Sequence, residues 1–331
     1  MAPRQEPVES IPLYAALDLG TNNCRMLIAK QTPYGFRVVD SFSRVTRLGE
    51  DVSQSGMLSE DAMERTIRAL SVCSKKIQAR QVSFIRSVAT EACRRAENAD
   101  IFLSRVMEET GIKLEAITPE EEAGLALAGC ASLLNLEKPK ALVFDIGGGS
   151  TEIMWIELDR VGDPHVVDVI SLPVGVVNIS EKYAEADEVN ADNYQAIQDH
   201  VLSAIADFNK RNHIATHVAN RQVQMLGTSG TVTTLGAIHL RLPRYLRSKV
   251  DGMNLAFKEI HRVSQNLTTM NLKQRAAHPC IGASRADLVL AGCAILEALC
   301  TLWPVGELTI ADRGIREGIL LKLMRSVNDE A

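Results

Sequence analysis

Two short segments of the sequence each combine an aspartate with glycines and small polar residues. Residues 18–23 read D-L-G-T-N-N and residues 145–150 read D-I-G-G-G-S, so the two align without a gap. Each follows an apolar run and precedes another, which is typical of a β-hairpin. Turns of such residues leave backbone N–H groups unobstructed, and these groups bind phosphate oxygens. The candidate phosphate-binding residues of the two turns are Thr21, Asn22, Asn23, Gly147, Gly148, Gly149, Ser150 and Thr151.

Carboxylates flank both segments. A single hairpin of this kind is explained by the turn alone, because Gly allows positive φ and Asp forms an Asx turn. Two equivalent loops favour phosphate binding instead. Asp18 and Asp145 open the segments, and Glu152 follows the second one. Carboxylates are the oxygen ligands of hydrated Mg²⁺ or Mn²⁺, so these three residues are the candidate metal ligands.

A third glycine-containing segment, G-T-S-G-T at 227–231, follows a predicted strand and opens a predicted helix. Gly230 and Thr231 can therefore bind an anion at a helix N-terminus, although an ordinary Ser/Thr-capped turn explains the segment equally well. The sequence contains no G-x-x-x-x-G-K-[ST], G-x-S-x-G or G-x-G-x-x-G. Their absence argues against a P-loop, a serine hydrolase and a dinucleotide enzyme.

Acids and arginines elsewhere supply further candidates. Residues 118–121, T-P-E-E, form a capping box, and they place three glutamates, 120–122, in the first turn of a helix. Each of the three can act as a general base or simply favour the helix dipole, and the pattern does not choose among them. Arg25 and Arg94 can each bind a phosphate with two N–H groups, although a lone arginine is usually a solvated surface residue.

The elements that must position these residues alternate between strands and helices, which indicates an α/β class. Apolar spacing predicts helices over 59–79, over 91–110, from 119 to about 134, and over 313–326. The matching loops begin 127 residues apart, at 18 and 145, so we expect a duplicated fold with both loops facing one cleft. The predicted organisation is a flexible tail at 1–12, a first domain at 13–136 on which a closing helix at 313–331 packs, and a second domain at 137–312, with a hinge at 137–140.

Composition excludes several classes of protein. The chain has 331 residues, 46% of them hydrophobic, and a net charge of −5. Mild acidity gives no general attraction for nucleic acids or anionic membranes, so neither is expected as a partner. Seven cysteines form no C-x-x-C pair, no apolar run approaches a membrane span of roughly 18 residues, and the N-terminus lacks a signal sequence. These features predict a reduced cytoplasmic protein with buried thiols.

Several segments together resemble a known family. With the three loops described above, V-A-T-E-A-C-R-R-A-E-N at 88–98, E-E-A at 121–123, R-A-D-L-V at 285–289 and R-E-G at 316–318 occur in the order and spacing of the exopolyphosphatase/guanosine pentaphosphate phosphatase (Ppx/GppA) family. This resemblance implies two duplicated actin-like domains of the ribonuclease H-like, Hsp70 and sugar kinase superfamily, which flank a cleft. The chain looks like the short, two-domain form of the family.

The resemblance also implies a function and assigns roles. Members hydrolyse the terminal phosphoryl group of polyphosphate or guanosine pentaphosphate with Mg²⁺. Glu122 corresponds to the base that positions the attacking water, Asp145 and Glu152 to carboxylates near the metal, and 147–151 to the phosphate cradle. The arginines that correspond to cations near the ligand are Arg25, Arg94 and Arg285. The catalytic helix often reads S-G-x-E-E-A-R, so Pro119 and Gly124 depart from the pattern and bear on substrate preference.

Three functional hypotheses follow. The first is a Mg²⁺-dependent phosphohydrolase of polyphosphate or guanosine penta- and tetraphosphate. The second is a binding protein that senses ppGpp with little turnover, and the third is an ATP-using kinase of the same superfamily. Whether the chain forms a homodimer is left open. A basic cluster is interpreted as a solvated loop or as a rim for a long anion; its members are Arg241, Arg244, Arg247 and Lys249.

Overall fold

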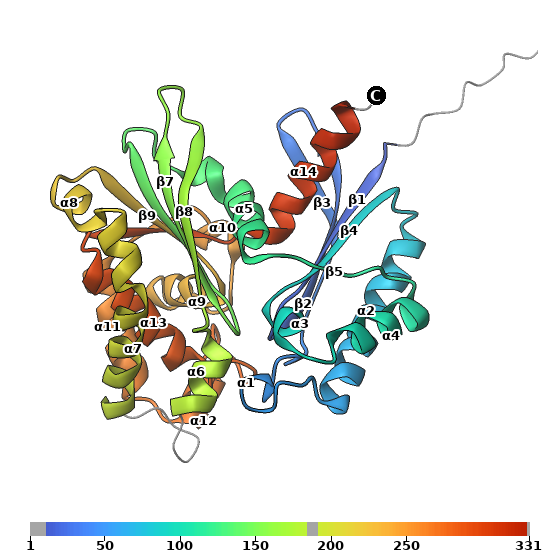
Figure 1. Ribbon diagram of the computed structural model, residues 1–331, viewed down its shortest axis with the longest axis horizontal. Coiled ribbons are helices and arrows are strands. Elements are labelled where there is room, and N and C mark those ends of the chain that lie inside the picture. Colours follow the sequence, from blue (N-terminus) through green and yellow to red (C-terminus); the bar gives the residue numbers. More distant parts are fainter. Residues whose placement is uncertain (1–10, 184–190, 330–331) are drawn as a thin grey trace, which may run out of the picture.

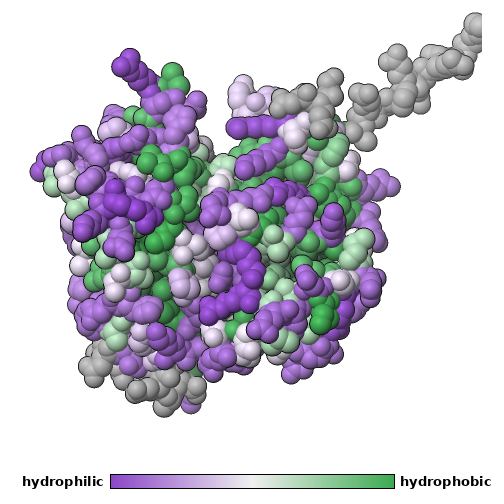
Figure 2. Space-filling model, in the orientation of Figure 1, coloured by the Kyte–Doolittle hydropathy of each residue, from purple (hydrophilic) through white to green (hydrophobic). Residues whose placement is uncertain are grey.

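The computed structural model describes residues 11–183 and 191–329, which form two α/β halves that lie side by side (Figure 1). Most of the expected tail, residues 1–10, and the last two residues of the closing helix lie outside the described residues. Figure 2 shows the surface notched between the halves at the upper edge of this view, whereas below the notch the halves meet.

The first half is built on a five-stranded sheet in the order β3-β2-β1-β4-β5. β1, β2 and β3 form an antiparallel meander, and β4 and β5 continue the sheet parallel to β1. The strands are β1 (Leu13–Leu19), β2 (Asn23–Thr32), β3 (Gly35–Val45), β4 (Phe84–Ala89) and β5 (Glu115–Ala116).

The second half repeats this arrangement in a six-stranded sheet with the order β10-β11-β9-β6-β7-β8. The β6-β7-β8 meander corresponds to β1-β2-β3, and β9 lies parallel to β6 as β4 lies parallel to β1. The duplicated α/β fold expected from the two loops is therefore confirmed. The strands are β6 (Lys140–Ile146), β7 (Thr151–Leu158), β8 (Pro164–Leu172), β9 (Val223–Thr228), β10 (Asn254–Ala256) and β11 (Glu307–Ala311).

Helices cover the outer faces of both sheets and fill the space between them (Figure 1). Those of the first half are α1 (Val52–Ser55), α2 (Glu60–Ala79), α3 (Glu91–Arg95), α4 (Ala99–Thr110) and α5 (Pro119–Cys130), followed by the 3₁₀ helix η1 (Ala131–Leu133). Those of the second half are α6 (Val176–Tyr183), α7 (Ala191–Arg211), α8 (Ile214–Ala219), α9 (Gly230–His239), α10 (Arg247–Val250), α11 (Phe257–Thr268), α12 (Leu272–Ala277) and α13 (Val289–Leu302). The last helix, α14 (Ile315–Asp329), packs on α5 and β1.

α5 and α14 lie between the two sheets and belong to a core that both halves share. This core contains Ala16 of β1 and Val143 of β6 as well as Leu125 of α5 and Ile319 of α14. Each half also has a separate outer core. Since removing apolar area from water is the main stabilising contribution to folding, the shared core holds the two halves together.

The predicted helix over 91–110 is wrong in one respect, because the structure divides it into α3 and α4. Asn98 lies at the break and is buried. Its side-chain amide donates to the carbonyl oxygen of Leu58 at 3.0 Å and accepts from the N–H of Leu58 at 2.8 Å. This contact with a segment 40 residues away outweighs the local helical preference.

Candidate active site

The β1–β2 turn (20–23) and the β6–β7 turn (147–150) touch each other where the two halves meet. In both, the N–H of the first residue donates to the carbonyl oxygen of the fourth, at 2.9 and 2.8 Å. A Cβ at Gly148 would lie 3.0 Å from the Cβ of Thr21, and one at Gly149 would lie 2.9 Å from the Oγ1 of Thr21. Only glycine fits at these two positions without displacing the opposite turn.

A cavity between the halves brings most of the candidate residues together. Both turns, the start of α9 and the first turn of α5 contribute to its wall. The residues singled out by the sequence that line it are Asp18, Thr21, Asn22, Asn23, Arg25, Glu122, Asp145, Gly147, Gly148, Gly149, Ser150, Gly230, Thr231 and Arg285.

Two acids occupy equivalent places beside this cavity. Asp18 lies near the end of β1 and Asp145 near the end of β6. Within the described part of the chain, neither carboxylate accepts a hydrogen bond or forms an ion pair. Burial raises the pKa of Asp18, and it raises the pKa of Asp145 to about 8. Such carboxylates favour a proton or a cation as a partner.

The donor set fits Mg²⁺ better than an ion that requires a full set of protein ligands. The described residues contain no group of three or more His, Cys, Asp or Glu side chains that could hold a metal ion. Mg²⁺ usually keeps several waters and binds one or two carboxylates together with substrate phosphates. Asp18 and Asp145 match that requirement.

Glu122 is separated from its neighbouring glutamates by burial. It is 7% exposed, whereas Glu120 is exposed to solvent and Glu121 pairs with Arg86. Of the three, only Glu122 is among the described residues that line the cavity. Of the three acids that the sequence pattern leaves equal, only Glu122 can act there.

Arg94 holds Glu122 in place. Its Nη1 donates to the Oε2 of Glu122 at 2.7 Å and to the carbonyl oxygen of Ile117 at 2.9 Å, and its Nη2 pairs with Glu91 at 3.2 Å. Burial, followed by the negative charge of Glu152, raises the pKa of Glu122 well above its usual value, whereas Arg94 opposes the shift. A carboxylate with a raised pKa is suited to accept a proton from water. Arg94 contacts this acid and does not line the cavity.

Two further candidates lie behind the β6–β7 turn. Thr151 is fully buried, and its hydroxyl donates to the carbonyl oxygen of Val174 at 2.6 Å. The Oε1 of Glu152 accepts from Ser150 at 2.6 Å and from Ser171 at 2.8 Å. The structure therefore places Thr151 and Glu152 beneath the turn and not on the cavity wall.

The third glycine segment forms the remaining side of the cavity. α9 begins at Gly230, and the hydroxyl of Ser229 accepts the N–H of Thr231 at 3.1 Å. The Ser-capped turn is therefore present, it uses the N–H groups of Thr231 and Val232, and Gly230 and Thr231 line the cavity. Arg285 lies beside it, with its Nη1 3.5 Å from the Oγ1 of Thr234.

Two charged residues near the cavity were assigned no role from the sequence. Glu91 lines the cavity and pairs with Arg94. Arg316 lines a second, adjoining cavity together with Arg25 and Arg285, and it forms no ion pair with another described residue. The R-E-G motif at 316–318 is the sequence signal that could have pointed to Arg316.

Comparison with known proteins identifies the family of the chain. The sequence model of the Ppx/GppA phosphatase family matches residues 27–327. The chain belongs to the Ppx/GppA phosphatase family. The resemblance expected from the loop motifs is confirmed.

Three relatives place the chain within this family. It is 30% identical over 304 residues to the bifunctional 3-dehydroquinate synthase/phosphatase of Fusobacterium nucleatum, across 87% of this chain and 43% of the relative. It is 28% identical over 316 residues to the guanosine-5'-triphosphate,3'-diphosphate pyrophosphatase of Photobacterium profundum, across 95% and 59%. It is 29% identical over 322 residues to exopolyphosphatase 2 of Mycobacterium tuberculosis, across 93% and 98%. The chain thus spans about half the length of the first two relatives and nearly all of the third.

Solved structures support the fold. The Ppx/GppA family member of Aquifex aeolicus has a TM-score of 0.76 at 30% identity and covers 96% of this chain and 99% of its own. An exopolyphosphatase from Cytophaga hutchinsonii has a TM-score of 0.84 at 22% identity, over 95% and 98%, which bears on the fold alone. These likenesses confirm the actin-like, two-domain class. No helix within residues 11–183 and 191–329 has the length and apolar character needed to span a membrane.

Proposed function

We propose that this protein is a phosphohydrolase that releases the terminal phosphate of a linear phosphoanhydride, either inorganic polyphosphate or guanosine pentaphosphate. The observation that carries the proposal is the position of Glu122. This buried carboxylate, held by Arg94, shares one cavity with the backbone N–H groups of two glycine-containing turns. Relatives named as an exopolyphosphatase and a guanosine-5'-triphosphate,3'-diphosphate pyrophosphatase support this class of substrate.

In the proposed reaction, Glu122 accepts a proton from the attacking water. Its Oε2 is fixed by Arg94, and its Oε1 has no hydrogen-bond partner in the described part of the chain, which leaves it available to water. The turns donate N–H groups to the phosphate oxygens, and Arg25 and Arg285 add positive charge. Phosphoryl transfer depends mainly on positioning and charge stabilisation, so no covalent nucleophile is required.

We propose Mg²⁺, or Mn²⁺ in its place, as the cofactor. Asp18 and Asp145 would hold the ion, and Glu152, fixed beneath the turn by two serines, would add negative charge behind it. When bound, the ion supplies positive charge beside the phosphate oxygens that become more negative in the transition state.

The test compares phosphate release from polyphosphate of defined length and from pppGpp by the wild type and by Glu122→Gln. General-base catalysis contributes about 10²- to 10⁴-fold, so we expect kcat to fall by that factor. Glu120→Gln, in the same helical turn but exposed, should leave kcat within about twofold because it removes no contact with the cavity.

Unchanged release by Glu122→Gln would overturn the mechanism. Tight, Mg²⁺-insensitive binding of ppGpp without phosphate release from any substrate would indicate a binding protein instead. A rate that rises with chain length would identify polyphosphate as the preferred substrate.

A further inference from the structure

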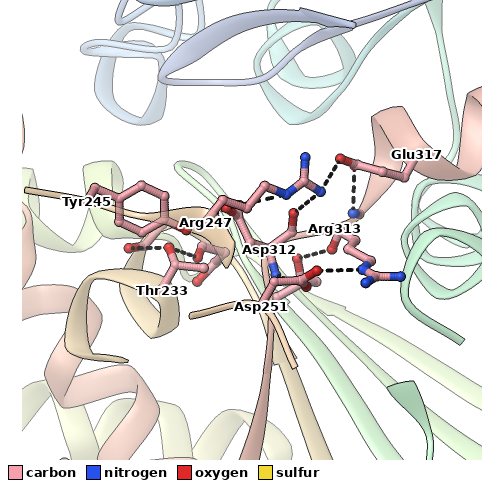
Figure 3. Close-up of polar contacts among 11 residues, drawn as sticks. Thr233, Tyr245, Arg247, Asp251, Asp312, Arg313 and Glu317 are labelled. Carbon is pink, nitrogen blue, oxygen red and sulfur yellow. Dashed lines mark hydrogen bonds and ion pairs between the residues drawn. The ribbon is translucent and has the colours of Figure 1, made fainter. Parts of the chain in front are cut away.

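The chain crosses between the halves for a second time at residues 312–314, where β11 leads into α14. This crossover is tied to the second half, as Figure 3 shows. The carboxylate of Asp251 accepts the N–H of Asp312 at 3.1 Å and pairs with the Nε of Arg313 at 2.8 Å. The hydroxyl of Thr228 donates to the carbonyl oxygen of Arg313 at 2.8 Å. The end of the sheet and the crossover are therefore one connected unit.

Arg247 extends this connection into α14 (Figure 3). From α10 of the second half, its Nη2 donates to the carbonyl oxygen of Asp312 at 2.5 Å and to the Oε1 of Glu317 at 2.8 Å. Glu317 is 3% exposed, and its Oε2 accepts the N–H of Gly314 at 3.0 Å. One buried carboxylate thus joins the first turn of α14 to a cation from the other half.

α14 is in turn locked against the helix that carries the proposed base. A Cβ at Gly318 would lie 1.9 Å from the carbonyl oxygen of Leu125, and one at Gly129 would lie 2.1 Å from that of Gly314. The backbones of α5 and α14 therefore touch with no side chain between them. Glu122 lies one helical turn before Leu125, so a shift of α14 also moves Glu122.

We propose that Arg247 is a positioning residue which, by binding Glu317, fixes the α5–α14 pair and therefore Glu122 relative to the phosphate-binding turns of the second half. This inference rests on the proposed function. Arg247 lines neither of the two adjoining cavities, so it acts through the helices and does not contact the substrate. Apolar packing in the shared core resists separation of the halves, but apolar contacts are not directional. The charge-assisted hydrogen bond between Arg247 and Glu317 has a preferred geometry, so it fixes the orientation of α14.

The same contact explains one member of the basic cluster. Arg247 pairs with Glu317 at 2.8 Å and with Asp312 at 3.7 Å. The other three basic residues of the cluster form no ion pair with any residue that the structure describes. Arg247 is therefore held by acids of the crossover and α14, although all four members of the cluster are exposed.

The test separates positioning from stability with three variants: Arg247→Ala, Glu317→Gln and the two combined. Arg247→Ala leaves Glu317 buried without its cation, which is strongly destabilising, whereas the double variant removes both charges. We expect the unfolding temperature to fall in Arg247→Ala and to recover largely in the double variant. A small misplacement can reduce a rate about 10²-fold, so kcat should be about 10- to 100-fold lower in all three, with KM within about threefold.

Recovery of kcat together with stability in the double variant would overturn the proposal, because the pair would then be merely structural. Arg247→Lys, which retains a cation, should restore part of kcat. Arg211→Ala is the matched control, since Arg211 also pairs with an acid, Asp168, at 2.6 Å, but on the exposed side of the second half. It should leave kcat within about twofold.

A distance measurement tests the same inference without catalysis. The seven native cysteines are buried, so spin labels can be attached at Met107→Cys and Val161→Cys, exposed sites in the two halves. The distribution of label distances should broaden in Arg247→Ala and in the double variant but not in Arg211→Ala. If the wild type hydrolyses none of the substrates yet the distances broaden, the proposed function fails and the positioning role stands. Unchanged distances would overturn the positioning role.

Discussion

Four carboxylates around the cavity lie in surroundings that oppose their ionisation. Burial is the main reason that the pKa values of Asp18, Glu122, Asp145 and Glu152 are all raised. The positive charges of Arg94 and Arg25 lower these pKa values, but by less than burial raises them. A metal ion that binds to these carboxylates, alone or together with phosphate, must therefore compete with protons. The affinity for the metal ion should increase with pH.

We expect Asp145→Asn to change how stability depends on pH. The pKa of Asp145 is about 8 in the folded protein against 3.8 for the free side chain. The folded state holds this proton more tightly than the unfolded state does, and this difference stabilises the fold. The stabilisation is complete below pH 3.8 and is lost as pH rises through 8. The free energy of unfolding of the wild type should fall across this window by up to about 1.4 kcal/mol per pH unit, and the variant should flatten that slope. Urea unfolding in EDTA, from pH 4 to pH 8, measures it.

Asp40→Asn is the control, with the opposite sign. A hydrogen bond from Lys76 lowers the pKa of the half-buried Asp40, so its contribution to stability is present above pH 3.8 and is lost as pH falls through the lowered value. This variant should differ from the wild type near neutral pH and converge with it in acid. Parallel curves for the wild type and Asp145→Asn from pH 4 to pH 8 would contradict the prediction.

At the scale of elements, the residues near the start of α5 predict where the helix begins, but they do not predict what the helix packs against. Thr118 caps the helix by accepting the N–H of Glu121 at 3.2 Å, and Pro119 occupies the first turn. The carboxylate of Glu121 pairs with Arg86, so the described residues show one of the two hydrogen bonds of the predicted capping box. Leu125, Ala126 and Leu127 are nevertheless all buried, and only a narrow stripe that contains Gly124 and Ala128 is partly exposed. A helix buried on most sides lies inside a core, which here is the core between the sheets.

We expect Gly318→Ala to destabilise the protein. The new Cβ would lie 1.9 Å from a backbone oxygen of α5, and neither helix can yield without disturbing the shared core. Overpacking of this kind costs about 1–3 kcal/mol in the free energy of unfolding, which chemical denaturation measures.

Gly124→Ala in α5 is the opposite case. Nothing lies within 4 Å of its added Cβ, so the variant should gain up to about 1 kcal/mol from the better helix former. Equal effects of the two substitutions would show that α5 and α14 do not touch as closely as described.

At the scale of the whole molecule, the halves are joined in two physically different ways. On one side they share the apolar core around α5 and α14. On the other side the contacts are polar. Arg47 pairs with Asp287 at 2.9 Å, and Glu181 of α6 accepts from the N–H of Asp51 at 3.1 Å and from the hydroxyl of Ser53 at 3.0 Å. Water can replace such partly exposed contacts, so we expect the molecule to open on this second side.

The double variant Arg47→Ala/Glu181→Ala should therefore loosen the molecule without unfolding it. Exposed pairs contribute little, so the free energy of unfolding should change by less than about 1 kcal/mol. Amide hydrogen exchange should accelerate in residues 47–55 and 176–183, while exchange in α14 stays unchanged. Acceleration throughout α14 would show that these polar contacts support the shared core as well.

The break between α3 and α4 and the role of Arg94 show where sequence-based prediction stops. The apolar spacing over 91–110 is continuous, but Asn98 binds the backbone of Leu58. The sequence predicts Arg94 near the phosphate, and the structure adds its contact with Glu122, 28 residues away. Both outcomes depend on a partner that local periodicity does not identify.

The amino-acid sequence by itself determined the features that depend on near neighbours. These are the two glycine-containing turns, the capped start of α5, the buried thiols and, through the repeated motif, the duplicated fold. Only the tertiary structure decided that Glu122 faces the cavity, that Glu152 lies beneath the turn and that Arg247 reaches α14. The reason is physical, because burial and the pairing of charges depend on distances between segments that folding brings together from far apart in the chain.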